Sequence, residues 1–224
     1  MTGKKNAGGS KGRWLVLLLF APALLLFITS RGCKMKFKTL EDFGPVNNYA
    51  FVDADGKSYT QDDFKGNVLI FTNIQPDCLD TCSINLFTFE KIIYQDIRSK
   101  KSLKHVKIIS FVNDVDGNPV KDLKPMMDLM KDKIHKFDPE KWMIVSGDAR
   151  RVYDIKNNGE TLLQTGEQYF GGNAFQELML LVDKENHLRM VLRGNVEGMF
   201  RRMKECIALL QKEYSTNDTV ENNK

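Results

Sequence analysis

The chain has 224 residues, of which 42% are hydrophobic and 28% are charged. This composition excludes a disordered polypeptide and a multi-pass membrane protein, and the length favours one domain with an appendage. The net charge of +4 is unevenly distributed: residues 1–33 carry five basic and no acidic residues, whereas the rest carries 28 basic and 29 acidic residues. Because the body has no basic excess, the sequence argues against a nucleic-acid-binding domain.

The N-terminus contains a hydrophobic segment, residues 14–30, which is seventeen residues long, has no charge and follows a basic tail, residues 1–13. A membrane-spanning helix needs roughly 17–25 apolar residues, so we expect a transmembrane signal anchor. A cleaved signal peptide and a lipoprotein lipidated at Cys33 are the alternatives that stay open. Each alternative places the following domain, after a linker at residues 31–38, at a membrane surface. We expect that surface to be the extracytoplasmic (periplasmic) side.

The body alternates patterns typical of strands and helices, and we expect one domain at residues 39–214 and a flexible polar tail at residues 215–224. The order of the elements predicts an α/β fold with a mixed sheet that ends in a hairpin. The predicted strands are 49–52, 68–72, 106–112, 142–145, 178–182 and 188–192. The predicted helical segments are a turn at 60–64 capped by Thr60, then 84–97, 120–134, a helix capped by Asp148 that runs to 155, and 196–214.

Cys78 and Cys82 are the residues best suited to chemistry, because they lie just after a predicted buried strand and just before a predicted helix. Active sites of open α/β sheets lie at the carboxyl ends of strands. A helix N-terminus stabilises a thiolate, and a pair of thiols can alternate between dithiol and disulfide. Two thiolates also suit a soft metal ion such as Cu(I).

Less specific interpretations of the pair are two buried structural cysteines or a permanent disulfide. The turn-forming and capping residues around the pair, such as Pro76 and Asp80, favour a loop over a buried core position. A structural zinc site would need four ligands, and the sequence offers no further pair of ligands at a suitable spacing. Cys206 fits a buried hydrophobic position in the last helix.

Several motifs, in this order, resemble the Sco/SenC family. They are an N-terminal anchor, FVDADG at 51–56, DFKGN at 63–67 running into VLIF, the C-x-x-x-C at Cys78 and Cys82, VKIISFV at 106–112, WMIVSG at 142–147 and LMLLVDKENHLR at 178–189. The resemblance covers roughly residues 40–213. The three-residue gap between the cysteines is its most specific element.

The resemblance implies a thioredoxin-like fold in a membrane-anchored protein that helps to assemble the copper site of cytochrome c oxidase. It implies that Cys78 and Cys82 act as redox-active or copper-binding residues. The sequence departs from the family at the third copper ligand, a His that the family has eight residues before the Asp of the late hairpin. Counting back from Asp183 reaches Phe175, and neither Phe175 nor its neighbours are histidines.

Two functions are therefore weighed against each other. In the first, the chain is a membrane-tethered thiol–disulfide oxidoreductase whose client is the cysteine pair of the oxidase copper site. In the second, it is a Cu(I) metallochaperone that uses Cys78, Cys82 and a third donor other than His. A peroxidase of the peroxiredoxin type fits the motif poorly because Asp80 replaces the required hydroxyl. A non-catalytic adaptor on a thioredoxin scaffold is the remaining alternative.

Overall fold

The computed structural model describes residues 39–76, 85–157, 160–161 and 175–221. The chain divides into two units after Lys38, and all of these residues belong to the second. Within them, no helix combines the length and the apolarity that a membrane crossing requires, and the predicted span 14–30 lies outside them.

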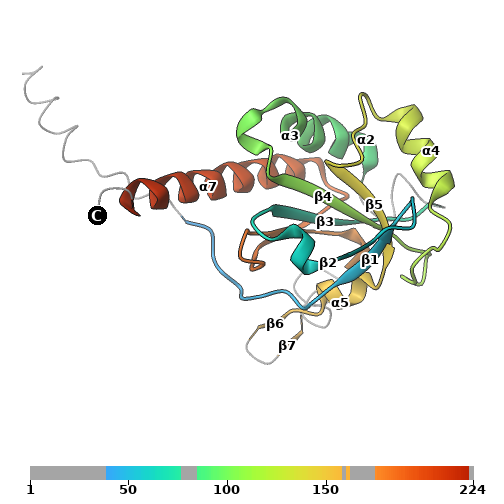
Figure 1. Cartoon of the computed structure of the whole chain (residues 1–224), viewed down its shortest axis with the longest axis horizontal. Helices are drawn as coiled ribbons and strands as arrows, with labels where there is room; N and C mark the ends of the chain where they lie inside the picture. The colour runs from blue at the N-terminus through green and yellow to red at the C-terminus, as the bar shows by residue number, and fades with distance from the viewer. Residues whose placement is uncertain (1–38, 77–84, 158–159, 162–174, 222–224) are drawn as a thin grey trace, which may run out of the picture. The chain divides into compact units, whose positions relative to one another are not determined.

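A seven-stranded mixed sheet, in the order β2-β1-β5-β4-β3-β8-β9, forms the centre of the fold (Figure 1). Strands β3, β4 and β5 are mutually parallel, whereas β8 runs antiparallel to β3 and β9 antiparallel to β8. The strands are β1 (Ala50–Asp53), β2 (Ser58–Thr60), β3 (Val68–Ile74), β4 (Val106–Val112), β5 (Trp142–Gly147), β8 (Leu178–Val182) and β9 (Leu188–Arg193). Every residue of β3 is buried, as expected for a strand covered on both faces.

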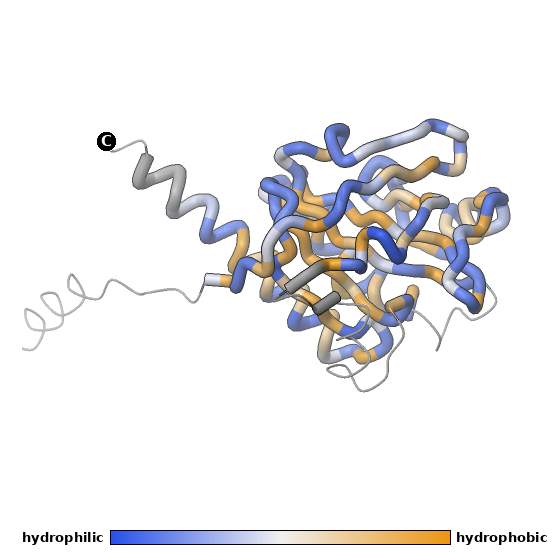
Figure 2. Tube along the Cα trace, turned by 90° about the horizontal axis from the view of Figure 1, so that it is seen from below, coloured by the Kyte–Doolittle hydropathy of each residue, from blue (hydrophilic) through white to orange (hydrophobic). Residues whose placement is uncertain are grey.

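The chain order around β3 is that of a thioredoxin-like fold, which confirms the expected fold class. A helical crossover joins β3 to its parallel neighbour β4, and the β8–β9 hairpin and a final helix complete the other side. Apolar side chains alternate along the strands and make two cores, one on each face of the sheet. In Figure 2 the hydrophobic segments gather in the sheet and the hydrophilic ones lie around it.

Helices cover both faces. The first face is packed by α2 (Leu86–Phe89), the π-helical turn Glu90–Tyr94 and α3 (Gln95–Ser99), which follow one another without a break, and by α4 (Lys124–Lys133) and α7 (Glu197–Glu221). The second face is packed by α5 (Ala149–Tyr153) and by a 3-10 turn, Gln61–Phe64. Short 3-10 turns also form at Lys101–Leu103 and Phe175–Glu177 (η4), and a small hairpin at Lys156–Asn157 and Glu160–Thr161.

Two predicted helix ends and one predicted cap need correction. The helix expected from residue 120 begins at Lys124, because Pro125 fits the first turn of a helix but not its interior. Asp148 occupies the N-cap position of α5, but its side chain makes no capping hydrogen bond. The last helix continues to Glu221 instead of ending at Tyr214. Strand β2 was not expected from the sequence.

A buried arginine joins the start of the described chain to the hairpin and to α7. The Arg189 guanidinium, 6% exposed, forms ion pairs with Asp183 at 3.1 Å and with Glu213 at 2.9 Å. It also donates to the carbonyl oxygens of Leu40 and Glu41, at 2.9 and 3.1 Å. Burying a guanidinium is costly unless its donors are paired, and here five acceptor atoms surround it.

Beside this arginine, His187 and Asp42 form a more exposed pair at 2.9 Å. The hydrogen bond raises the pKa of His187 and lowers the pKa of Asp42. Both pKa shifts favour the charged pair, but exposed pairs add little stability. The buried Arg189 cluster therefore holds residues 40–41 more firmly than the His187 pair holds residue 42.

We predict that Arg189→Met lowers the free energy of unfolding by about 3–5 kcal/mol, because it leaves the Asp183 carboxylate buried without its counter-charge. Urea denaturation of the two proteins measures the difference. The matched control is Arg201→Met on α7, whose ion pair with Glu197 is exposed and which should leave the midpoint unchanged. Equal midpoints for Arg189→Met and the unmodified chain would contradict the prediction.

Candidate functional site

Four segments meet around the carboxyl end of β3. The Asn113 amide donates to the Ile74 carbonyl at 3.0 Å, which joins the ends of β4 and β3. The Gly194 amide after β9 donates to the Glu177 carbonyl of η4, and the Asn85 amide at the start of α2 donates to the Gly194 carbonyl at 2.8 Å. The chain thus leaves β3 and enters α2 on a rim that these backbone hydrogen bonds hold together.

The start of α2 is well defined. Asn85 is its N-cap residue, and the Asn85 side chain accepts a hydrogen bond from the Thr88 amide at 3.0 Å. The helical path then continues through the π-helical turn to Ser99. The free amide groups of such a helix start carry partial positive charge, which favours an anion such as a thiolate nearby.

A chain of buried amide groups links the strand ends to η4. Asn73, in β3, and Asn113, just after β4, are both fully buried. The Asn113 Nδ2 donates to the Asn73 Oδ1 at 2.7 Å, and the Asn73 Nδ2 donates to the Phe175 carbonyl at 3.3 Å. The Asn113 Oδ1 is buried without a hydrogen-bond partner in the part of the chain that the structure describes.

A second buried chain of polar groups lies further from the strand ends, at Thr72 in β3, Ser110 in β4 and Trp142 in β5. The Trp142 indole Nε1 donates to the Ser110 hydroxyl at 2.8 Å, and Ser110 is 2.6 Å from the Thr72 hydroxyl. Because Ser110 accepts from Trp142, its own proton can go to Thr72. This chain joins the three parallel strands through their side chains.

Phe175 lies at the end of the first chain, beside β3. Its ring centroid is 5.6 Å from that of Tyr153, and the Arg150 guanidinium lies 5.6 Å from the ring centroid. The Tyr153 hydroxyl donates to the Leu178 carbonyl at 2.9 Å, and burial raises the Tyr153 pKa, so the phenol keeps its proton. Position 175, where the Sco/SenC resemblance would place the third copper ligand, is therefore filled by an aromatic ring packed among aromatic and cationic groups.

Cys78 and Cys82, the predicted site residues, lie outside the described residues, as does Cys33. The described chain ends at Pro76 and resumes at Asn85, so both cysteines belong to the connection between β3 and α2. Cys206 is fully buried in α7 as predicted, and burial raises its thiol pKa, which makes it unreactive. No group of three or more His, Cys, Asp or Glu side chains in the described residues is placed to hold a metal ion.

The sequence reasoning missed Asn73, Asn113 and Gln176. All three are buried polar side chains near the carboxyl ends of β3 and β4. A signal was present for the first two, because Asn73 is an amide residue inside the buried strand run and Asn113 directly follows the next one. Such residues must find hydrogen-bond partners, which marks the ends of β3 and β4 as a specific structure.

No protein-family model matches the chain, and no curated protein matches it. Solved structures that resemble it include a SCO1/SenC family lipoprotein from Bacillus anthracis (19% identity, 76% of this chain and 99% of that one, TM-score 0.46). Yeast Sco1 with copper bound (14%, 74% and 93%, 0.46) and a thiol:disulfide interchange protein from Bacteroides sp. (16%, 75% and 91%, 0.45) are two others. Sco/SenC proteins are thus among the solved structures that this chain resembles at low sequence identity.

We predict that Gly117→Ala destabilises the protein more than Gly66→Ala. Both glycines have positive φ, +79° and +76°, and a side chain there costs about 1–2 kcal/mol in either case. A Cβ at Gly117 would also lie 2.9 Å from Phe175 Cζ and from Gln176 Nε2, whereas the space at Gly66 is open. The extra loss, about 1–3 kcal/mol, measures how rigidly Phe175 is held. If both substitutions lowered the free energy of unfolding equally in urea denaturation, Phe175 and Gln176 in η4 would be able to move aside without a measurable cost.

Proposed function

We propose that the chain is a membrane-tethered, Sco-like thiol–disulfide protein that assists assembly of a cytochrome c oxidase copper site. Cys78 and Cys82 carry the exchange, and the client is the oxidised cysteine pair of that copper site. The observation that supports this most is the position of the C-x-x-x-C motif in the connection between the buried end of β3 and the capped start of α2. This is where open α/β folds place reactive groups.

The proposed reaction moves two electrons from the chain to its client. The thiolate of one cysteine, Cys78 in the version we favour, attacks one sulfur of the client disulfide and displaces the other as a thiolate. Cys82 then attacks the mixed disulfide, which releases the second client thiol. The chain ends with a Cys78–Cys82 disulfide and the client with two thiols that can take copper. Membrane reductants of the dithiol class regenerate the chain.

The arrangement of the rim supports this role. The start of α2 favours the thiolate form of a nearby cysteine, whereas Asp77 and Asp80 disfavour it. A thiol with a pKa that is not strongly lowered suits a reductant, because a strong oxidant needs a very stable thiolate.

The membrane tether belongs to the same proposal. Deletion of residues 1–38 should release the chain from the membrane fraction, and a deletion variant that stayed bound would contradict the proposal.

We predict that Cys82→Ser, in the full-length chain, traps a mixed disulfide with an oxidised peptide that carries the two cysteines of an oxidase copper site. Cys78→Ser should give no such species, because the attacking thiol is gone. Non-reducing electrophoresis and mass spectrometry detect the product.

Cys206→Ser is the matched control and should exchange as the unmodified chain does, because Cys206 is buried. Undiminished exchange in the Cys78→Ser, Cys82→Ser double variant would refute the proposal. Trapping by Cys78→Ser instead of Cys82→Ser would keep the proposal and reverse the order of attack.

Copper delivery is the second candidate function, and Phe175 is the residue that decides it. Two thiolates alone can hold Cu(I), but the ring at position 175 offers no donor, so copper cargo would be held by Cys78, Cys82 and a donor from elsewhere. The Phe175 backbone is tied to the end of β3 through Asn73, which places position 175 beside the strand that leads to the motif. An imidazole at position 175 would therefore supply the missing ligand.

We predict that Phe175→His raises the Cu(I) affinity of the reduced, full-length chain by about tenfold or more, as competition with a Cu(I) chelator under anaerobic conditions would measure. Phe175→Leu is the control, since it removes the same packing against Tyr153 without adding a donor. If the unmodified chain already bound one Cu(I) tightly and Phe175→His changed nothing, a different third donor would be present and copper delivery would become the leading function.

A further inference from the structure

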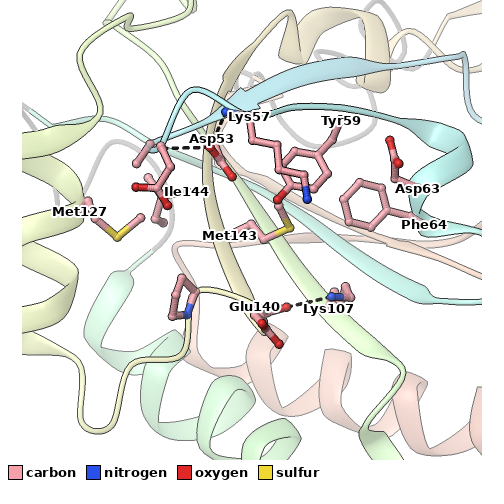
Figure 3. A pocket seen from close by; sticks show the side chains of 13 residues that line it. Asp53, Lys57, Tyr59, Asp63, Phe64, Lys107, Met127, Glu140, Met143 and Ile144 are labelled. Atoms are coloured by element: carbon pink, nitrogen blue, oxygen red, sulfur yellow. Dashed lines mark hydrogen bonds between the residues drawn. The ribbon is translucent and has the colours of Figure 1, made fainter.

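A cavity of about 430 Å³ lies near the amino ends of the parallel strands, away from the candidate site at their carboxyl ends (Figure 3). It is bordered by the turn between β1 and β2, by the first residues of β4 and β5, and by α4. The candidate site lies at the carboxyl ends of β3 and β4, whereas this cavity lies at the amino ends of β4 and β5. Its volume falls in the range of small-molecule binding pockets.

Lys107 is the unusual residue of this cavity. All other residues of β4 are buried, and Lys107 alone is half-buried among them. Its ammonium group donates to the Glu140 carbonyl at 3.0 Å and forms no ion pair with a carboxylate of the described residues. Burial lowers the Lys107 pKa, because the charged ammonium group is less stable away from water. The Glu140 and Asp138 carboxylates attract this charge without forming an ion pair with it. An ammonium group that faces a cavity and makes no direct ion pair is suited to an anionic ligand.

A second cation lies on the same side. The Lys57 ammonium sits 4.6 Å from the centroid of the Tyr59 ring and, like Lys107, has no ion pair in the described part of the chain. In Figure 3 the Met143 thioether lies between the side chains of Lys57 and Lys107. The two ammonium groups therefore border one apolar surface from two sides.

The lining also contains four carboxylates, and their contacts decide which anion fits. The Asp53 carboxylate accepts hydrogen bonds from the Asp55 and Lys57 amides, both at 2.9 Å, and the Asp63 carboxylate accepts one from the Thr60 amide at 2.7 Å. These two acids are thus engaged by their own turns. Asp55 and Glu140 are exposed and repel further negative charge. Polyanions such as phosphate esters are disfavoured, and a single negative charge is tolerated.

The remaining walls are apolar. Met127, Met143, Ile144, Phe64 and Pro139 line the cavity, and in Figure 3 Met127 lies across from Met143. Methionine side chains adapt to ligands of different shapes. We propose that the cavity binds a small organic monocarboxylate, with its carboxylate on the Lys107 ammonium group and its hydrocarbon part against Met143 and Met127. Lys57, on the other side of Met143, adds a weaker attraction at longer range.

The test is a titration of the full-length chain, labelled with ¹³C at the methionine methyl groups, with sodium hexanoate. The Met127 and Met143 methyl resonances should shift and saturate, whereas those of Met126 and Met130, which are buried in the core, should not. Neutral hexanamide and cationic hexylammonium should bind at least about tenfold more weakly, because each loses the charge-assisted hydrogen bonds. Equal or tighter binding of either one would overturn the proposal.

Variants separate the ammonium groups from the apolar walls. Lys107→Gln should weaken hexanoate binding by about tenfold or more and Lys107→Arg should largely retain it, whereas the exposed Lys57→Gln should weaken it about two- to fivefold. Lys65→Gln is the matched control, because Lys65 is paired with Asp62 and does not line this cavity. Unchanged Met126 and Met130 resonances show that a variant is folded. Binding to folded Lys107→Gln at unmodified strength would refute the proposal.

Discussion

One hydrogen bond between two fully buried amides, from Asn113 to Asn73, joins the central parallel strands at the edge where the chain turns toward its cysteines. A buried amide that loses its partner costs about 1–3 kcal/mol, so these groups restrict what can lie around them. That bond uses the Asn73 oxygen, so the Asn73 Nδ2 still needs an acceptor, and the Phe175 carbonyl provides one. Through this contact the position of η4, and with it the rim of the candidate site, depends on the polar ends of two otherwise apolar strands.

The same contact explains why thiol chemistry and metal binding are not equally well supported. Disulfide exchange needs two sulfurs, and Cys78 and Cys82 both belong to the connection between β3 and α2. Cu(I) delivery needs a further donor, and the residue that the Asn73 contact holds beside β3 is a phenylalanine packed against Tyr153. Position 175 thus lies beside β3, and the side chain found there has no lone pair to offer a metal ion.

The sheet was predictable from sequence because its strands are short apolar runs that alternate with helical patterns. Buried strands such as 106–112 are defined by their own residues, whereas helix ends depend on local chemistry that periodicity does not capture, as Pro125 shows. Strand β2 was missed because Ser58–Thr60 has no apolar pattern and gains its structure from pairing with β1. The contacts of Asn73 and the cavity around Lys107 could not be predicted. Both join residues that are far apart in the sequence, and such contacts produce no periodic pattern of apolar residues.

The contacts of Arg189 set a limit on where the domain can be cut. Two of its acceptors are backbone carbonyls, those of Leu40 and Glu41, which no side-chain substitution can remove. A shortened chain that starts after Glu41 would lack both acceptors and would expose a guanidinium that still faces Asp183 and Glu213. The smallest autonomous fragment therefore has to begin at or before Leu40, and a protease that cleaved just after Glu41 would loosen the domain that remained.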